Sequence, residues 1–136
     1  MGRLFGTDGI RGVANEYPLT VGGSFRIGRA VASYFSTGKR QAGIIIGKDT
    51  RQSGPMIEKS LTEGICSVGT DAYLAGILPT PAVAYLVSAG EAAAGIVISA
   101  SHNPYNDNGI KLFDTAGYKL TDDKEDEIER IVSAES

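Results

Sequence analysis

The 136-residue chain has a formal net charge of −3 and a pI near 5.1, with 42% hydrophobic and 21% charged residues. This balance is typical of a globular domain and excludes wholesale disorder. An acidic chain also lacks the basic field that attracts nucleic acid or an anionic membrane, so neither is expected as a partner. No run approaches the roughly 18 apolar residues of a membrane span, and the start of the chain lacks a signal-peptide stretch.

The number of cysteines indicates the cellular compartment. Cys66 is the only cysteine, so no disulfide can form within the chain and a reducing compartment is expected. We therefore expect a cytoplasmic protein. The helical spacing around Cys66 predicts a small, buried hydrophobic side chain.

The first half of the chain alternates between helix and strand patterns. Thr20 is a suitable N-cap for a helix over residues 21–35, where apolar side chains recur at helical spacing. The apolar run over residues 42–47 predicts a strand that is covered on both faces. Pro55 suits the first turn of a second helix, which we expect to end at Gly69.

The second half continues the alternation. We expect a strand over residues 71–77, a short helix over 79–89 and a strand over 95–99. A turn at Thr115-Ala-Gly117 then predicts a hairpin. Thr121 is expected to cap a last, acidic helix.

Strands that alternate with helices predict an α/β fold, here a mixed, largely parallel sheet between helices in three layers. Residues 1–136 contain no internal repeat, low-complexity segment or linker, so we expect one domain. The acidic helix stops at Ser136 without an obvious structural ending. We expect the natural protein to continue beyond it.

A polar turn follows the strand at residues 95–99 and concentrates the reactive side chains. It contains Ser101, the only histidine (His102), Asn103 and Asn108, and it leads to Lys111. In α/β proteins the end of a strand is where rigid elements position a functional loop. This turn is therefore the main candidate site.

A hydrolase and a metal site are both weakly supported alternatives. Ser101 lacks the G-x-S-x-G context of a nucleophile elbow, and His102 is the only histidine that could act as its base. His102 could equally orient the turn by hydrogen bonding. One histidine, one cysteine and scattered carboxylates do not show metal-ligand spacing.

Phosphate binding fits the residues better. Arg11 lies in a glycine-bracketed segment, Arg51 follows the strand at residues 42–47, and Lys111 follows the polar turn. Cations from separate loops, gathered at one sheet edge, can hold a phosphoryl group, although each could also be an ordinary surface charge. No Walker or G-x-G-x-x-G motif is present, so ATP or a dinucleotide is not expected as a cofactor.

Three blocks of sequence carry a family resemblance. They are Phe5-Gly-Thr-Asp-Gly-Ile-Arg-Gly12, Gly47-Lys-Asp-Thr-Arg-Gln-Ser-Gly54, and Ser99-Ala-Ser-His-Asn-Pro104 with Asn108-Gly-Ile-Lys111. In this order they resemble the α-D-phosphohexomutase family, and most closely its phosphoglucosamine mutase branch. The resemblance implies that the chain is domain I, with the phosphoserine loop, of a four-domain enzyme whose other three domains are absent here.

The resemblance also implies roles for individual residues. Ser101 matches the serine that carries the phosphoryl group, and Lys111 matches a phosphate-binding lysine that acts as general acid or base. Arg11 matches an arginine that supports the phosphoryl group. His102 and Asn103 match residues beside the nucleophile, and we expect His102 among the catalytic residues and Asn103 among those that bind the phosphate. The family's Mg²⁺ would be bound through the phosphate on Ser101, with its other ligands outside this chain.

The implied activity is that of an isomerase. It would interconvert glucosamine 6-phosphate and glucosamine 1-phosphate through a sugar bisphosphate, for UDP-N-acetylglucosamine and cell-wall precursors. The implied partners are the sugar phosphate, the bisphosphate activator and the remaining mutase domains, and a homodimer stays open. Phosphomannomutase, phosphoglucomutase and a non-catalytic phosphate-binding module are the alternatives, although binding alone needs neither Ser101 nor Lys111. We expect this chain by itself to be inactive.

Overall fold

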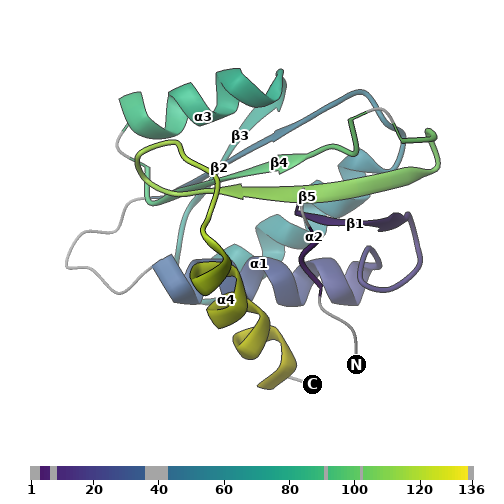
Figure 1. The fold of residues 1–136 in the computed structure, drawn as a ribbon, viewed down its shortest axis with the longest axis horizontal. Coiled ribbons are helices and arrows are strands. Elements are labelled where there is room, and N and C mark those ends of the chain that lie inside the picture. The colour runs from purple at the N-terminus through teal and green to yellow at the C-terminus, as the bar shows by residue number, and fades with distance from the viewer. Residues whose placement is uncertain (1–3, 7–8, 36–42, 91, 102, 135–136) are drawn as a thin grey trace.

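In a computed structural model of the chain, a five-stranded sheet lies between helices (Figure 1). The structure describes residues 4–6, 9–35, 43–90, 92–101 and 103–134. The elements follow in the order β1 (Ile10–Val13), α1 (Val21–Phe35), β2 (Ile44–Lys48), α2 (Gly54–Ser67), β3 (Ala72–Ile77), α3 (Thr80–Ala89), β4 (Ala94–Ile98), β5 (Asp107–Phe113) and α4 (Asp122–Ala134).

The strands are arranged in the order β1-β5-β4-β2-β3. β2 pairs in parallel with β3 and with β4, whereas β5 is antiparallel to both β4 and β1. The predicted mixed α/β fold is therefore confirmed, with the parallel pairs confined to one half of the sheet. β5 runs antiparallel to β4 because the chain returns between these strands through a short loop, without a crossover helix.

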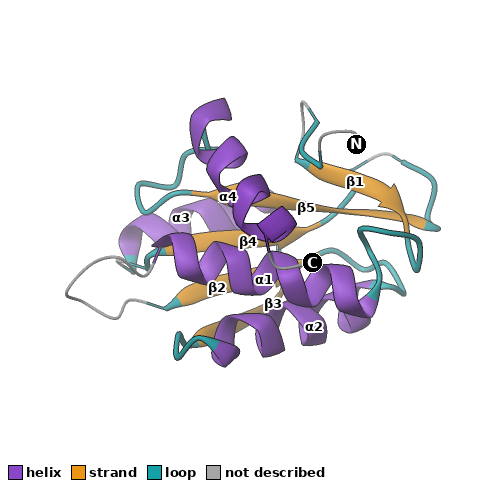
Figure 2. Cartoon of the chain, turned by 90° about the horizontal axis from the view of Figure 1, so that it is seen from below, coloured by secondary structure: helices purple, strands orange, loops and turns teal. Residues whose placement is uncertain are grey.

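Helices cover both faces of the sheet (Figures 1 and 2). α3 lies on one face, and α1, α2 and α4 lie on the other. Beneath α3 the sheet carries Gly47 and Gly95, where a Cβ atom would lie 2.4 Å from a methyl of Val83 and of Val87, respectively. The opposite face presents the fully buried side chains of the main core, including Ile46, Ile96 and Ile110.

The predicted helix boundaries are largely confirmed. Thr20 Oγ1 accepts a hydrogen bond from the backbone N–H of Gly23 at 2.9 Å, so it caps α1 as expected. Pro55 lies in the first turn of α2, and Gly69 follows that helix with φ of 82°. No helix in the described part of the chain combines the length and apolarity needed to span a membrane.

The environment predicted for Cys66 is wrong, because this thiol is exposed. The buried face of α2 is formed by residues including Ile57, Leu61 and Ile65. Cys66 follows Ile65 by one position, a rotation of about 100° around the helix, and so lies off this buried face.

Two features of the sheet differ from the expected pattern. The segment Ile10–Val13, interpreted as part of a glycine-rich loop, is strand β1, and β5 begins at Asp107, inside the predicted polar turn. Beyond β5 the hairpin turn forms as expected, with the Gly117 N–H donating to Asp114 O at 2.9 Å. Its second arm, however, is reduced to a single bridge between Phe113 and Lys119.

Candidate functional site

Ser101 lies three residues beyond β4 in a left-handed backbone conformation. Its φ is 54°, its N–H donates to Ser99 Oγ at 3.1 Å, and its side chain is exposed. A non-glycine residue in this region is disfavoured by roughly 1–2 kcal/mol and persists only when its surroundings hold it. The turn therefore holds the Ser101 hydroxyl in a specific orientation toward solvent.

Two cations from neighbouring strands donate to that hydroxyl. Lys111 Nζ on β5 lies 3.1 Å from Ser101 Oγ, and Arg11 Nη2 on β1 lies 3.3 Å from it. Arg11 pairs with Gly109 across the antiparallel ladder, and Lys111 follows Gly109 by two residues. Side chains two residues apart lie on the same face of a strand, so the register places both cations on one face of the sheet.

Glycine is required where the loop, β5 and β1 meet. A Cβ atom at Gly109 would lie 2.7 Å from Ser99 O and 2.8 Å from Ile10 O. Both contacts are with backbone and cannot be relieved by rotating a side chain. Gly109 thus allows the start of the loop to lie close to the strand that carries Lys111.

Asn103 orients one of the cations. Its Oδ1 accepts a hydrogen bond from Arg11 Nη1 at 3.0 Å, and its Nδ2 donates to Asp107 Oδ2 at 3.2 Å. Asn108, in contrast, is fully buried and donates to Ser53 Oγ at 2.8 Å. His102, which was expected beside the nucleophile, lies outside the described residues.

Arg51 also lies at the site, but its guanidinium contacts the backbone rather than the Ser101 hydroxyl. Its guanidinium donates to the carbonyl oxygens of four loop residues, Ser101, Asn103, Pro104 and Asp107. Its Nε donates to Asp49 Oδ2 at 3.1 Å. The sequence interpretation missed Asp49, although its position directly after β2 is a usable signal.

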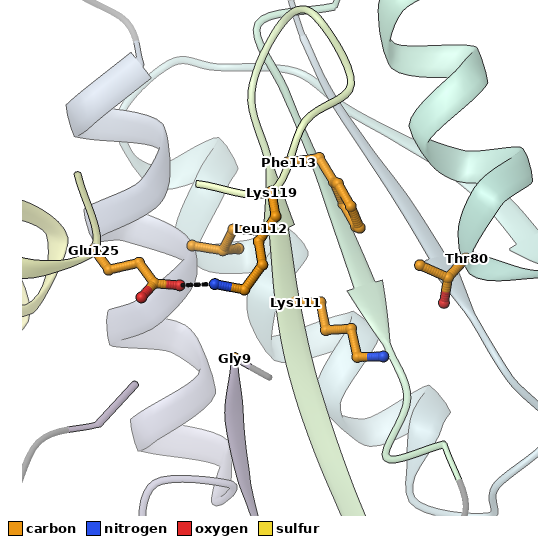
Figure 3. A pocket seen from close by; sticks show the side chains of 7 residues that line it. All are labelled: Gly9, Thr80, Lys111, Leu112, Phe113, Lys119 and Glu125. Carbon is orange, nitrogen blue, oxygen red and sulfur yellow. Dashed lines mark hydrogen bonds and ion pairs between the residues drawn. The ribbon is translucent and has the colours of Figure 1, made fainter. Parts of the chain in front are cut away.

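A shallow pocket of about 190 Å³ opens beside Lys111 (Figure 3). It is lined by Gly9, Thr80, Lys111, Leu112, Phe113, Lys119 and Glu125. Within it Lys119 Nζ lies 3.5 Å from Glu125 Oε2, and the Glu125 side chain is only 3% exposed. Lys111 thus both lines the pocket and contacts Ser101. Lys119 and Glu125 were not singled out from sequence, because only the fold brings the hairpin arm against α4.

The described residues do not form a metal site of their own. They contain no group of three or more histidine, cysteine, aspartate or glutamate side chains that could hold an ion.

An exposed serine hydroxyl at a strand end, with an arginine and a lysine donating to it, defines an α/β domain suited to holding a phosphoryl group. The chain belongs to the phosphoglucomutase/phosphomannomutase family, since residues 2–136 match its α/β/α domain I. The resemblance seen in the three sequence blocks is thereby confirmed.

Named relatives agree with this assignment. A phosphoglucosamine mutase from Syntrophus aciditrophicus is 57% identical over 132 residues, which are 97% of this chain and 29% of that protein. One from Geotalea uraniireducens is 56% identical with the same coverage. The chain therefore spans under a third of the length of these relatives.

Solved structures share the fold. A phosphoglucomutase/phosphomannomutase family protein from Burkholderia thailandensis superimposes with a TM-score of 0.83 at 29% identity, over 97% of this chain and 30% of that chain. The Paramecium phosphoprotein pp63/parafusin superimposes with a TM-score of 0.77 at 22% identity, over 97% of this chain and 25% of that one. The second likeness shows the fold alone.

Proposed function

We propose that the protein containing this chain is a phosphosugar mutase, an isomerase in which Ser101 carries the phosphoryl group. The observation that supports this most directly is the convergence of Arg11 Nη2 and Lys111 Nζ on Ser101 Oγ, at 3.3 and 3.1 Å. Phosphoryl transfer depends mainly on positioning and on stabilising charge. Two cations around one exposed hydroxyl supply both.

In the first half-reaction, the phosphoserine gives its phosphoryl group to a hydroxyl of the sugar monophosphate. The Ser101 Oγ–P bond breaks, a sugar O–P bond forms, and the sugar hydroxyl proton passes through Lys111 to the departing Ser101 Oγ, which lies 3.1 Å from Lys111 Nζ. In the second half-reaction, the bisphosphate presents its other phosphate, Ser101 Oγ attacks, and the Ser101 hydroxyl proton passes through Lys111 to the departing sugar oxygen. Arg11 stabilises the phosphoryl charge throughout, and serine needs activation only in this return step.

Mg²⁺ fits this scheme as a cofactor bound through the phosphate on Ser101. Its remaining ligands would come from parts of the protein outside this chain. When bound, it neutralises charge on the transferred group and so adds to what Arg11 and Lys111 provide.

The preferred sugar is proposed to be glucosamine phosphate, interconverted between its 6- and 1-phosphates in the cytoplasm. The support is the 57% and 56% identity to proteins named phosphoglucosamine mutase. The product would enter the synthesis of UDP-N-acetylglucosamine and cell-wall precursors. A sugar bisphosphate would serve as activator, and the remaining mutase domains would complete the site.

The test is phosphate transfer onto the full-length protein from glucosamine 1,6-bisphosphate labelled in its phosphates. We expect label on the peptide containing Ser101 and none in the Ser101→Ala variant. Ser88→Ala is the matched control, because Ser88 is exposed on α3 and donates only to Tyr85 O among the described residues. Equal labelling of wild type and Ser101→Ala would exclude the phosphoserine mechanism. Turnover of glucose or mannose phosphate in preference to glucosamine phosphate would reassign the substrate.

A further inference from the structure

Arg51 was expected among the phosphate-binding cations, but its contacts indicate a different role. We propose that Arg51, anchored by Asp49, is a positioning residue that holds the loop at residues 101 and 103–107 and thereby presents Ser101 Oγ. Arg51 is not a phosphate ligand in this proposal. The catalytic consequence rests on the proposed phosphoserine function, whereas the effect on the loop does not.

Every N–H group of the Arg51 side chain already has an acceptor. A guanidinium has five N–H donors in a rigid, planar arrangement. Nε donates to Asp49; Nη1 donates to the carbonyls of Pro104 (2.6 Å) and Asp107 (3.1 Å), and Nη2 to those of Ser101 (2.8 Å) and Asn103 (3.0 Å). The side chain is only 10% exposed. No donor is left for a phosphate.

The other two cations differ in this respect. Arg11 makes one hydrogen bond through each of Nη1 and Nη2 with described residues, and one of them goes to Ser101 Oγ. Lys111 also donates to that oxygen. Arg51 instead contacts the Ser101 carbonyl, on the backbone side of the residue. The phosphate-facing and backbone-facing cations are therefore separate groups.

An anchor outside the loop matters because the described loop residues make few backbone hydrogen bonds among themselves. Within it the Asn103 N–H donates to Ala100 O at 3.0 Å, and the Asp107 N–H donates to Pro104 O at 2.9 Å. Ser101 is meanwhile held at φ of 54°, which an L-residue rarely adopts. Backbone carbonyl groups require hydrogen-bond partners, and one guanidinium serves those of Ser101, Asn103 and Pro104 in the loop and that of Asp107 at the start of β5.

Asp49 connects this anchor to the sheet. Its N–H donates to Ile98 O at 3.0 Å, joining the end of β2 to the end of β4. Its carboxylate accepts from the Arg51 backbone N–H and from Arg51 Nε, both at 3.1 Å. The path from the sheet through Asp49 and Arg51 to Ser101 thus consists of direct hydrogen bonds.

The kinetic test uses Arg51→Ala and Arg51→Lys in the full-length protein. Lysine keeps the charge but has three donors on one nitrogen, so it cannot reproduce the planar arrangement. We expect both variants to lower kcat by at least about tenfold, since hydrogen bonds to a charged group are lost. KM for the sugar phosphate should change by less than about twofold. A raised KM with kcat unchanged, or full recovery in Arg51→Lys, would show a phosphate ligand and overturn the proposal.

Hydrogen exchange of the same proteins tests the loop without assuming any activity. In Arg51→Ala, peptides covering residues 99–107 should exchange at least about tenfold faster. Peptides covering β2 should exchange as in wild type, which shows that the fold is retained. Arg130→Ala is the matched control, because the exposed Arg130 pairs only with Glu127 among the described residues. Unchanged exchange over residues 99–107 would overturn the proposal.

Failure of the mutase proposal can be distinguished from failure of the positioning role of Arg51. If wild type is not phosphorylated at Ser101 but Arg51→Ala loosens the loop, the mutase proposal fails and the positioning role remains. If Arg51→Ala does not fold, Arg51→Lys carries the same exchange comparison.

Discussion

At the scale of single residues, the proposed mechanism assigns different roles to Lys111 and Arg11, which both donate to Ser101 Oγ. Lysine can release and accept a proton, whereas arginine stays charged and offers several donors. Lys111 Nζ lies 3.1 Å from Ser101 Oγ, and Lys111 lines the pocket in Figure 3. In the proposed mechanism Lys111 would exchange a proton with the sugar hydroxyl that approaches Ser101.

We expect Lys111→Met in the full-length protein to lower kcat by roughly 10²- to 10⁴-fold, the range typical of losing a general acid or base. The measurement is steady-state mutase kinetics. Lys124→Met is the matched control, since Lys124 Nζ lies 3.8 Å from Asp114 Oδ2 at 40% exposure and should leave kcat unchanged. Wild-type kcat in Lys111→Met would remove this lysine from the mechanism.

At the scale of elements, helices α1 and α2 pack backbone against backbone. A Cβ atom at Gly28 would lie 2.3 Å from Leu61 O, and one at Gly64 would lie 2.1 Å from Phe25 O. Each glycine therefore lets its helix lie against the main chain of the other. This close pair forms much of the layer beneath the sheet that carries the site (Figure 2).

Gly64→Ala should destabilise the chain by roughly 1–3 kcal/mol, because the added methyl meets backbone that can move only with the whole helix. The free energy of unfolding in urea measures this effect. Gly22→Ala is the control, since Gly22 is exposed on α1 and a Cβ there meets nothing within 4 Å. It should leave stability unchanged or raise it slightly, as alanine favours helix. Equal stability of the two variants would contradict the close packing.

Elements with a strong local pattern could be predicted from sequence, and β1 could not. Helix α1 has a capping threonine, and β2 and β4 are apolar runs bounded by glycine or polar turns. β1 is the four-residue stretch Ile10–Val13, which contains a glycine and an arginine. It is a strand because β5 supplies its hydrogen-bond partners. The local sequence of residues 10–13 does not indicate that pairing.

At the scale of the whole molecule, the chain presents only part of the proposed phosphoryl-transfer site, with the Ser101 side chain exposed. It spans 29% of the relatives' length, and its described residues contain no metal-binding group of their own. The chain holds the serine and two cations. The other contacts that a sugar bisphosphate needs would lie elsewhere in the protein.

We predict that the 136-residue chain, expressed alone, shows no mutase turnover. In the proposed mechanism, the contacts that bind the far phosphate and orient the sugar would come from parts of the protein outside this chain, and orientation supplies much of an enzyme's rate enhancement. The measurement is conversion of glucosamine 6-phosphate in the presence of the bisphosphate and Mg²⁺. Turnover above that of the Ser101→Ala chain would contradict the prediction.

The sequence by itself determined the family, the alternation of helices and strands, and the choice of Ser101, Arg11 and Lys111 as candidates. It could do so because these signals are local: residue type, periodicity and short motifs. Only the tertiary structure showed that β1 pairs with β5 and so brings Arg11 and Lys111 onto one face at Ser101 Oγ. It also showed that Arg51 uses its donors on the loop backbone. A side chain's partners depend on which distant segments the fold brings together, and sequence spacing does not contain that information.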